Sequence, residues 1–151
     1  MSHTSESTNP ESKYGLLQKL LGDYEYLGLV AQTIEEQLRL VEAAQTEMLT
    51  TIGSVRELVE KGRNRETLVP LGSGVMVPMS VHSPEKMLVL LGENVYAKLS
   101  VDKVEEYLSA RVKLLGERTN ELVRDYSTTL QRIQLLQPKI NRLAQELQVG
   151  G

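Results

Sequence analysis

The feature that most constrains the fold is a run of apolar residues spaced three and four apart between residues 17 and 59. It lasts about six heptads, whereas three or four already indicate a coiled coil. A globular helix would show a wider apolar stripe and would end sooner. The pattern therefore predicts a coiled-coil helix over residues 13–61. Its seam positions are Leu17, Leu20, Tyr24, Leu27, Ala31, Ile34, Leu38, Val41, Gln45, Met48, Ile52, Val55 and Val59.

A second heptad tract predicts a coiled-coil helix over residues 101–148. Ser100 can cap its start, and Asp102 suits the first turn of a helix. The two tracts are nearly equal in length, so a chain reversal between them would give an antiparallel two-helix coiled coil. The second seam contains Val101, Val104, Leu108, Val112, Leu115, Thr119, Leu122, Tyr126, Leu130, Ile133, Gln137, Ile140, Ala144 and Leu147.

Two irregularities are expected in the second helix. The four-residue steps from Leu122 to Tyr126 to Leu130 indicate a stutter, which locally relaxes the supercoil. Pro138 lacks an amide hydrogen and predicts a bend toward the end of the helix.

Between the helical tracts, residues 66–100 form the one stretch with a strand-and-turn pattern. Short Val-rich runs alternate with Gly, Pro, Ser and Asn. Hairpins this short are marginally stable alone, so we expect them to pair with another subunit. The expected hairpins join Thr67–Leu71 to Val75–Val81 through Gly72-Ser73-Gly74, and Lys86–Leu91 to Val95–Leu99 through Gly92-Glu93-Asn94.

The fold class expected from these patterns is α+β. The composition agrees, because Phe, Trp and Cys are absent from the 151 residues and bulky core material is scarce. Without Cys there is no disulfide or thiolate metal site, which fits a cytoplasmic protein. Residues 1–12 are polar and read as a disordered tail without a secretory signal. We expect no membrane span, and a net charge of −3 does not suggest a nucleic-acid partner.

The titratable residues do not form a catalytic pattern, so we expect no enzyme activity and no cofactor or metal. His82 stands alone in a loop, where a structural role is favoured over that of a general base. Gly72-Ser73-Gly74 precedes a strand and lacks the Lys of a phosphate-binding loop. Arg63, Asn64 and Arg65 could form a small phosphate patch, but a solvated linker is the favoured interpretation.

Leucines crowd the far end of the predicted coil, where both chain termini would lie. Four of them start the first helix, twice what a two-helix seam needs, and further apolar residues lie opposite. Exposed apolar clusters usually mark an interaction surface. The alternative is that these leucines only close the end of the coil.

The order helix, two hairpins, helix resembles the alpha-class subunit of archaeal prefoldin, over about Tyr14 to Gln148. The most specific pieces are Leu68-Val69-Pro70-Leu71-Gly72-Ser73-Gly74, Val89-Leu90-Leu91-Gly92-Glu93-Asn94-Val95-Tyr96 and Leu136-Gln137-Pro138-Lys139-Ile140. Two hairpins point to the alpha class, since the beta class has one.

The resemblance implies a holdase that works without ATP. Two alpha and four beta subunits would join their hairpins into an inter-subunit β-barrel platform, hold unfolded client proteins at the ends of the coiled coils, and pass them to a group II chaperonin. The residues implied in client binding are Leu16, Leu17, Leu20, Leu21, Leu143 and Leu147. Those implied in the oligomer interface are Val69, Leu71, Val75, Val77, Leu88, Leu90, Val95 and Tyr96.

A second function remains open from the residues themselves. The same helices could serve as spacers in a structural scaffold, or the hairpins could join chains into a filament. The leucines at the far end distinguish the two functions, because only a client-holding chaperone needs them exposed.

Overall fold

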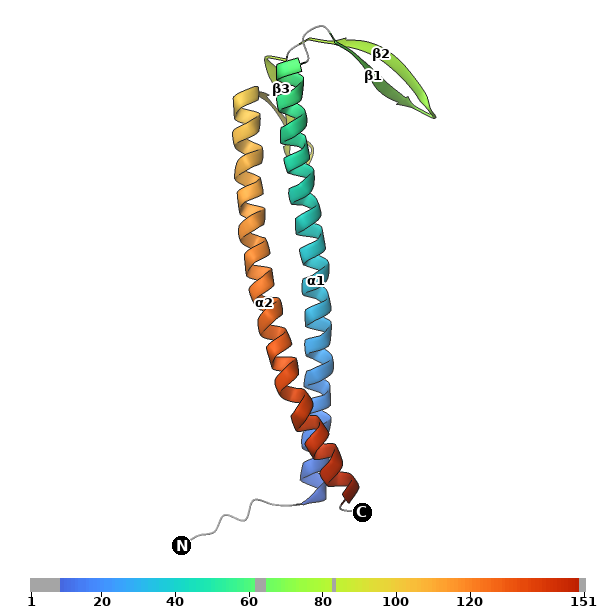
Figure 1. The fold of residues 1–151 in the computed structure, drawn as a ribbon, viewed down its shortest axis with the longest axis vertical. Coiled ribbons are helices and arrows are strands. Elements are labelled where there is room, and N and C mark those ends of the chain that lie inside the picture. Colours follow the sequence, from blue (N-terminus) through green and yellow to red (C-terminus); the bar gives the residue numbers. More distant parts are fainter. Residues whose placement is uncertain (1–8, 62–64, 83, 150–151) are drawn as a thin grey trace. The chain divides into compact units, whose positions relative to one another are not determined.

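A computed structural model describes residues 9–61, 65–82 and 84–149. Two long helices flank two antiparallel β-hairpins, which confirms the expected fold class (Figure 1). The chain divides into two compact units, residues 1–40 with 119–151 and residues 41–118. The elements are α1 (Pro10–Lys61), β1 (Arg65–Gly72), β2 (Val75–Val81), β3 (Lys86–Gly92), β4 (Val95–Ser100) and α2 (Val101–Val149).

Helix α1 begins at Pro10, three residues earlier than expected. The side-chain oxygen of Asn9 accepts a hydrogen bond from the Glu11 amide at 3.3 Å, and proline suits the first helical position. The predicted tail therefore loses residues 10–12 to the helix, and residues 1–8 lie outside the described residues. So do Arg63 and Asn64 of the expected linker, whereas Arg65 already belongs to β1.

In the first unit, α1 and α2 pack antiparallel. Lys13 pairs with Glu146 at 3.1 Å, and the Tyr126 hydroxyl donates a hydrogen bond to the Glu35 carboxylate. This hydrogen bond, together with desolvation and the charge of Glu35, raises the pKa of Tyr126 above its ordinary value of 10.0. The most buried side chain of this unit is that of Leu122, which is only 2% exposed.

The seam of α2 passes through Thr129 rather than Leu130, and through the half-buried Leu136 rather than the expected Gln137, which is exposed. Thr129 is 7% exposed and Leu130 is 36% exposed. A buried hydroxyl is tolerated here because it donates to the Asp125 carbonyl oxygen at 2.8 Å. With Thr129 in the seam, the spacing of seam residues alternates again between three and four. The prediction of a stutter at Leu130 is therefore wrong. The helix continues through Pro138, and the expected bend stays a prediction.

In the second unit, α1 and α2 also run antiparallel. Ile52, Val55 and Val104 are buried there. The Gln45 side-chain amide donates to the Val112 carbonyl oxygen at 3.3 Å, so the one polar seam residue of α1 has a partner on the opposite helix. Across both units, every predicted seam position of α1 is buried or half-buried, which confirms the assignment of its apolar face.

The two hairpins share one turn design. In each, two residues with positive φ connect the strands, Ser73 (50°) with Gly74 (79°) and Glu93 (38°) with Asn94 (63°). Positive φ at both positions gives the strand twist of a two-residue hairpin turn. Each first strand is also bulged just before its turn, between Pro70 and Gly72 in β1 and between Leu90 and Gly92 in β3.

The strands pair as expected, β1 with β2 and β3 with β4. Val69 lies opposite Val77 in the first hairpin, and Leu90 lies opposite Tyr96 in the second. Two prolines also lie in paired positions, with Leu68 opposite Pro78 and Pro70 opposite Met76. Each sheet contains only two strands, so every strand has one open edge.

Candidate functional site

The first candidate surface lies at the end of the first unit where both helix termini meet. We call it the tip and define it as residues 10–29 of α1 with residues 130–149 of α2, which the Lys13–Glu146 ion pair holds together. A two-helix pair has no further layer to cover apolar residues off the seam, so they remain in water. The large exposed apolar side chains of the tip are Tyr14, Leu16, Leu21, Tyr26, Leu29, Leu130, Leu135 and Val149.

The six leucines expected to bind clients fall into two groups. Leu16 and Leu21 are 48% and 42% exposed. The others are half-buried at seam spacing and also hold the helices together: Leu17, Leu20, Leu143 and Leu147. Only the first pair can be changed without opening the helix pair.

Besides Leu130 and Val149, four exposed tip residues were not among the expected client-binding residues: Tyr14, Tyr26, Leu29 and Leu135. Each of these four lies outside the heptad seam, in a helix that the sequence predicts from its heptads. An apolar residue at an outward heptad position is therefore the signal that would have identified them.

The second candidate surface lies on the hairpins of the second unit. Cross-strand partners project to the same face of a hairpin, and successive residues alternate between faces. In the second hairpin, Leu88, Leu90 and Tyr96 share the face that is exposed. The opposite face carries Met87 and Val89, which are half-buried. One face of this hairpin therefore packs within the unit, and the other is left for a partner.

The expected interface residues follow this division only in part. Those that are exposed are Leu71, Val75, Leu88, Leu90, Val95 and Tyr96, whereas Val69 and Val77 are half-buried opposite each other. The first hairpin adds exposed apolar residues that were not expected at the interface, Leu68, Met76 and Met79. A two-stranded sheet with this much exposed apolar surface and two open edges is typical of a strand-pairing interface.

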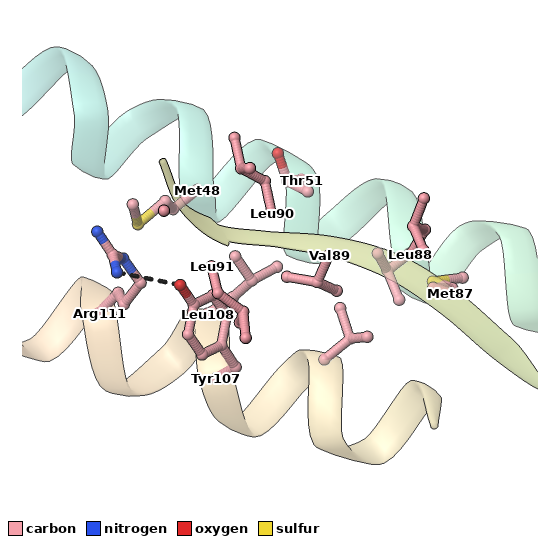
Figure 2. A pocket seen from close by; sticks show the side chains of 13 residues that line it. Met48, Thr51, Met87, Leu88, Val89, Leu90, Leu91, Tyr107, Leu108 and Arg111 are labelled. Carbon is pink, nitrogen blue, oxygen red and sulfur yellow. Dashed lines mark hydrogen bonds between the residues drawn. The ribbon is translucent and has the colours of Figure 1, made fainter. Parts of the chain in front are cut away.

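A groove of about 450 Å³ runs beside β3, between it and both helices of the second unit (Figure 2). Met48 and Thr51 of α1 line one side, and Tyr107 and Leu108 of α2 line the other. At one end, Arg111 donates to the Tyr107 hydroxyl at 3.0 Å. The lining is mainly apolar, so the groove suits side-chain packing rather than acid–base chemistry.

The described residues contain no cluster of metal ligands. Nowhere among them do three His, Cys, Asp or Glu side chains gather in a geometry that could hold a metal ion. Within the same residues, neither helix has the length and apolar content of a membrane span.

Comparison with known proteins identifies the class of this molecule. The family model "Prefoldin subunit" matches residues 27–146. The prefoldin alpha subunit of Thermofilum pendens is 26% identical over 82% of this chain and 95% of its own length. That of Pyrobaculum aerophilum is 26% identical over 84% and 94%. Among solved structures, filamentous PFD from Methanocaldococcus jannaschii matches with a TM-score of 0.54 and 22% identity, covering 85% of this chain and 98% of that one.

The chain belongs to the prefoldin family of chaperones. Its two hairpins and its alpha-subunit relatives place it in the alpha class. It is therefore a chaperone subunit that assembles with other prefoldin subunits, and the tip and the hairpins are its two candidate binding surfaces.

Proposed function

We propose that this chain is a holdase subunit that binds unfolded proteins at its tip without ATP. The supporting observation is the gathering of exposed apolar side chains at the tip, including Leu16 and Leu21. Side chains of this kind leave water when they contact an unfolded segment, at roughly 25 cal/mol per Å² of apolar area. Each contact is weak, but several tips in one assembly would add their contributions through effective concentration.

The hairpins would supply the assembly. Two alpha-class chains and four beta-class subunits would complete a β-barrel platform by pairing at the open strand edges, with Leu90 and Tyr96 among the side chains covered. The held client would then pass to a group II chaperonin in the cytoplasm.

A paired-variant experiment tests the client-binding role. Leu16→Ser with Leu21→Ser removes two exposed tip leucines that the seam does not need. Leu40→Ser with Leu114→Ser is the matched control, because these leucines are 71% and 63% exposed and lie outside the tip. Suppression of aggregation of a chemically unfolded protein should fall for the tip variant alone. Equal loss, or no loss, in both variants would exclude the tip as the client-binding surface.

A second candidate function is that of a filament-forming scaffold. The structural relative from Methanocaldococcus jannaschii is described as filamentous, and open strand edges can join chains without closure. The mass of the intact complex distinguishes the two functions. A closed hetero-oligomer with about two smaller subunits per copy of this chain would favour the holdase, as in a two-alpha, four-beta assembly. An open series of masses built from this chain would favour the scaffold.

A further inference from the structure

The tip carries an uneven distribution of charge on α2. Between Tyr126 and Gln145 the sequence contains three basic residues and no acidic one, although the whole chain has a net charge of −3. The three bases are Arg132, Lys139 and Arg142, and all three are exposed. Within the described part of the chain, no ion pair engages them.

The same three bases line two adjoining hollows between α1 and α2. The first, of about 390 Å³, is bounded by Leu16, Leu20 and Leu143 together with Lys139 and Arg142. The second, of about 330 Å³, shares Lys139 and adds Arg132. Its apolar walls are Tyr26, Leu27, Leu135 and Leu136. We call these two hollows together the basic groove.

The electrostatics of the basic groove favour one sign of partner. Asp23 is the one carboxylate among the residues that line it, against three cationic side chains. Each base stands beside leucines, so a bound segment would cover apolar surface and approach a cation at the same place. A basic segment would be repelled there, and a purely apolar one would leave the cations without partners.

The length of the groove sets the size of what it can hold. It runs from Leu16 to Leu27 on α1, which is about 17 Å at the rise of an α-helix. About five residues of extended chain span that length. Arg132 and Lys139 lie seven residues apart and Lys139 and Arg142 three apart, so cations occur along most of the groove.

We propose that the basic groove selects, among unfolded clients, segments in which acidic side chains accompany leucine-like ones. This proposal rests on the proposed client-holding function and adds a preference to it. The preference comes from α2, whereas the apolar contacts come from both helices.

The test compares binding of three short fluorescent peptides to the full-length protein in the assembly in which it purifies. The peptides share one Leu-rich centre and carry Glu, Ser or Lys flanks. Parent protein should bind the Glu-flanked peptide at least about fivefold more tightly than the Lys-flanked one, the scale expected of exposed ion pairs. The preference should shrink as salt rises, because salt screens exposed charges.

A matched pair of variants locates the preference. Lys139→Gln with Arg142→Gln should bring the affinity for the Glu-flanked peptide down toward that for the Ser-flanked one, because Arg132 is then the one base left in the groove. Lys113→Gln with Arg124→Gln is the control, because both bases are exposed on the same helix but lie outside the tip. The control variant loses the same two positive charges but should keep the full preference for Glu-flanked over Lys-flanked peptide.

The outcomes separate this proposal from the one on which it rests. If all three peptides bind equally, and the Leu16→Ser, Leu21→Ser variant weakens all of them, the tip holds clients but the acidic preference is overturned. If the tip variant weakens none of them, both proposals fail. If Lys139→Gln with Arg142→Gln changes the mass of the assembly instead of peptide affinity, the groove holds another subunit and the proposal is likewise overturned.

Discussion

The position of the α2 seam can be tested with one substitution made at three places. Leu122 is 2% exposed, Leu130 is 36% exposed and Leu135 is 66% exposed, all on the same helix. Leu→Ala at each site removes the same atoms and changes helix propensity equally. Differences in the free energy of unfolding therefore report burial alone.

The expected magnitudes follow from these exposures. Truncating the buried Leu122 loses its transfer free energy and leaves a cavity, which together cost about 3 kcal/mol, near the lower end for buried leucines because a two-helix pair can relax. Truncating Leu130 leaves no enclosed cavity and should lower the free energy of unfolding by about 1 kcal/mol. Truncating Leu135 should change the free energy of unfolding by less than about 0.5 kcal/mol.

Thermal melts at one protein concentration provide the measurement. For a chain of this size each kcal/mol shifts Tm by about 2–4 °C, so Leu122→Ala should lower it by about 6–12 °C and Leu130→Ala by about 2–4 °C. A loss at Leu130 equal to that at Leu122 would refute the assignment of Thr129 to the seam and restore the stutter. A large loss at Leu135 would show that the tip is covered by a partner in the purified assembly.

Three further predictions concern single contacts. The pKa of Tyr126 is raised by its hydrogen bond to Glu35, so the stabilisation is present below pH 10.0 and is lost as the pH rises through the folded-state pKa. Tyr126→Phe should melt below the parent at neutral pH, and the gap should close in alkaline buffer; a gap independent of pH would contradict this. Gln45→Leu should raise Tm because an apolar seam residue replaces a polar one. An unchanged Tm would mean that the hydrogen bond to the Val112 carbonyl is worth as much as the new packing. Gly116→Ala should stabilise α2 by about 0.5–1 kcal/mol through helix propensity. Its new methyl would stand 3.4 Å from the Gln45 amide nitrogen, so a lower Tm would show that this amide cannot move.

The seam of α1 was predictable because a single periodic signal determines it. Apolar residues repeat at three and four, and the one polar residue among them, Gln45, donates a hydrogen bond to the opposite helix. The seam of α2 was predicted less well because the pattern offered two neighbours, Thr129 and Leu130. Hydrophobicity favoured Leu130, whereas the hydrogen bond of the Thr129 hydroxyl to its own helix made burial of the polar residue acceptable.

The hairpins were predictable in position but not in orientation. Gly72 and Gly92 mark the turns, and the observed strands extend the expected ones by at most two residues at any end. Which face packs within the unit could not be predicted, since both faces of the second hairpin carry apolar residues. The half-burial of Met87 and Val89 depends on helices that lie far away in sequence.

The acidic preference proposed for the tip was also beyond the sequence analysis. The gap in acidic residues after Asp125 is visible in the sequence. What the sequence does not give is that Lys139 and Arg142 border the same hollow as Leu16 and Leu20 of the other helix.

The paired prolines of the first hairpin make its edges unequal to those of the second. A proline has no backbone donor, so the pairs Leu68–Pro78 and Pro70–Met76 suit the ladder positions whose backbone groups face the open edges rather than each other. Each open edge of that hairpin thus lacks one donor. The strands of the second hairpin contain no proline, so no donor is missing from their open edges. A strand arriving from outside would meet an interrupted ladder at one hairpin and a continuous one at the other. Proline on an edge strand reduces pairing with the edges of other sheets. The first hairpin should therefore resist aggregation even before a partner subunit covers it.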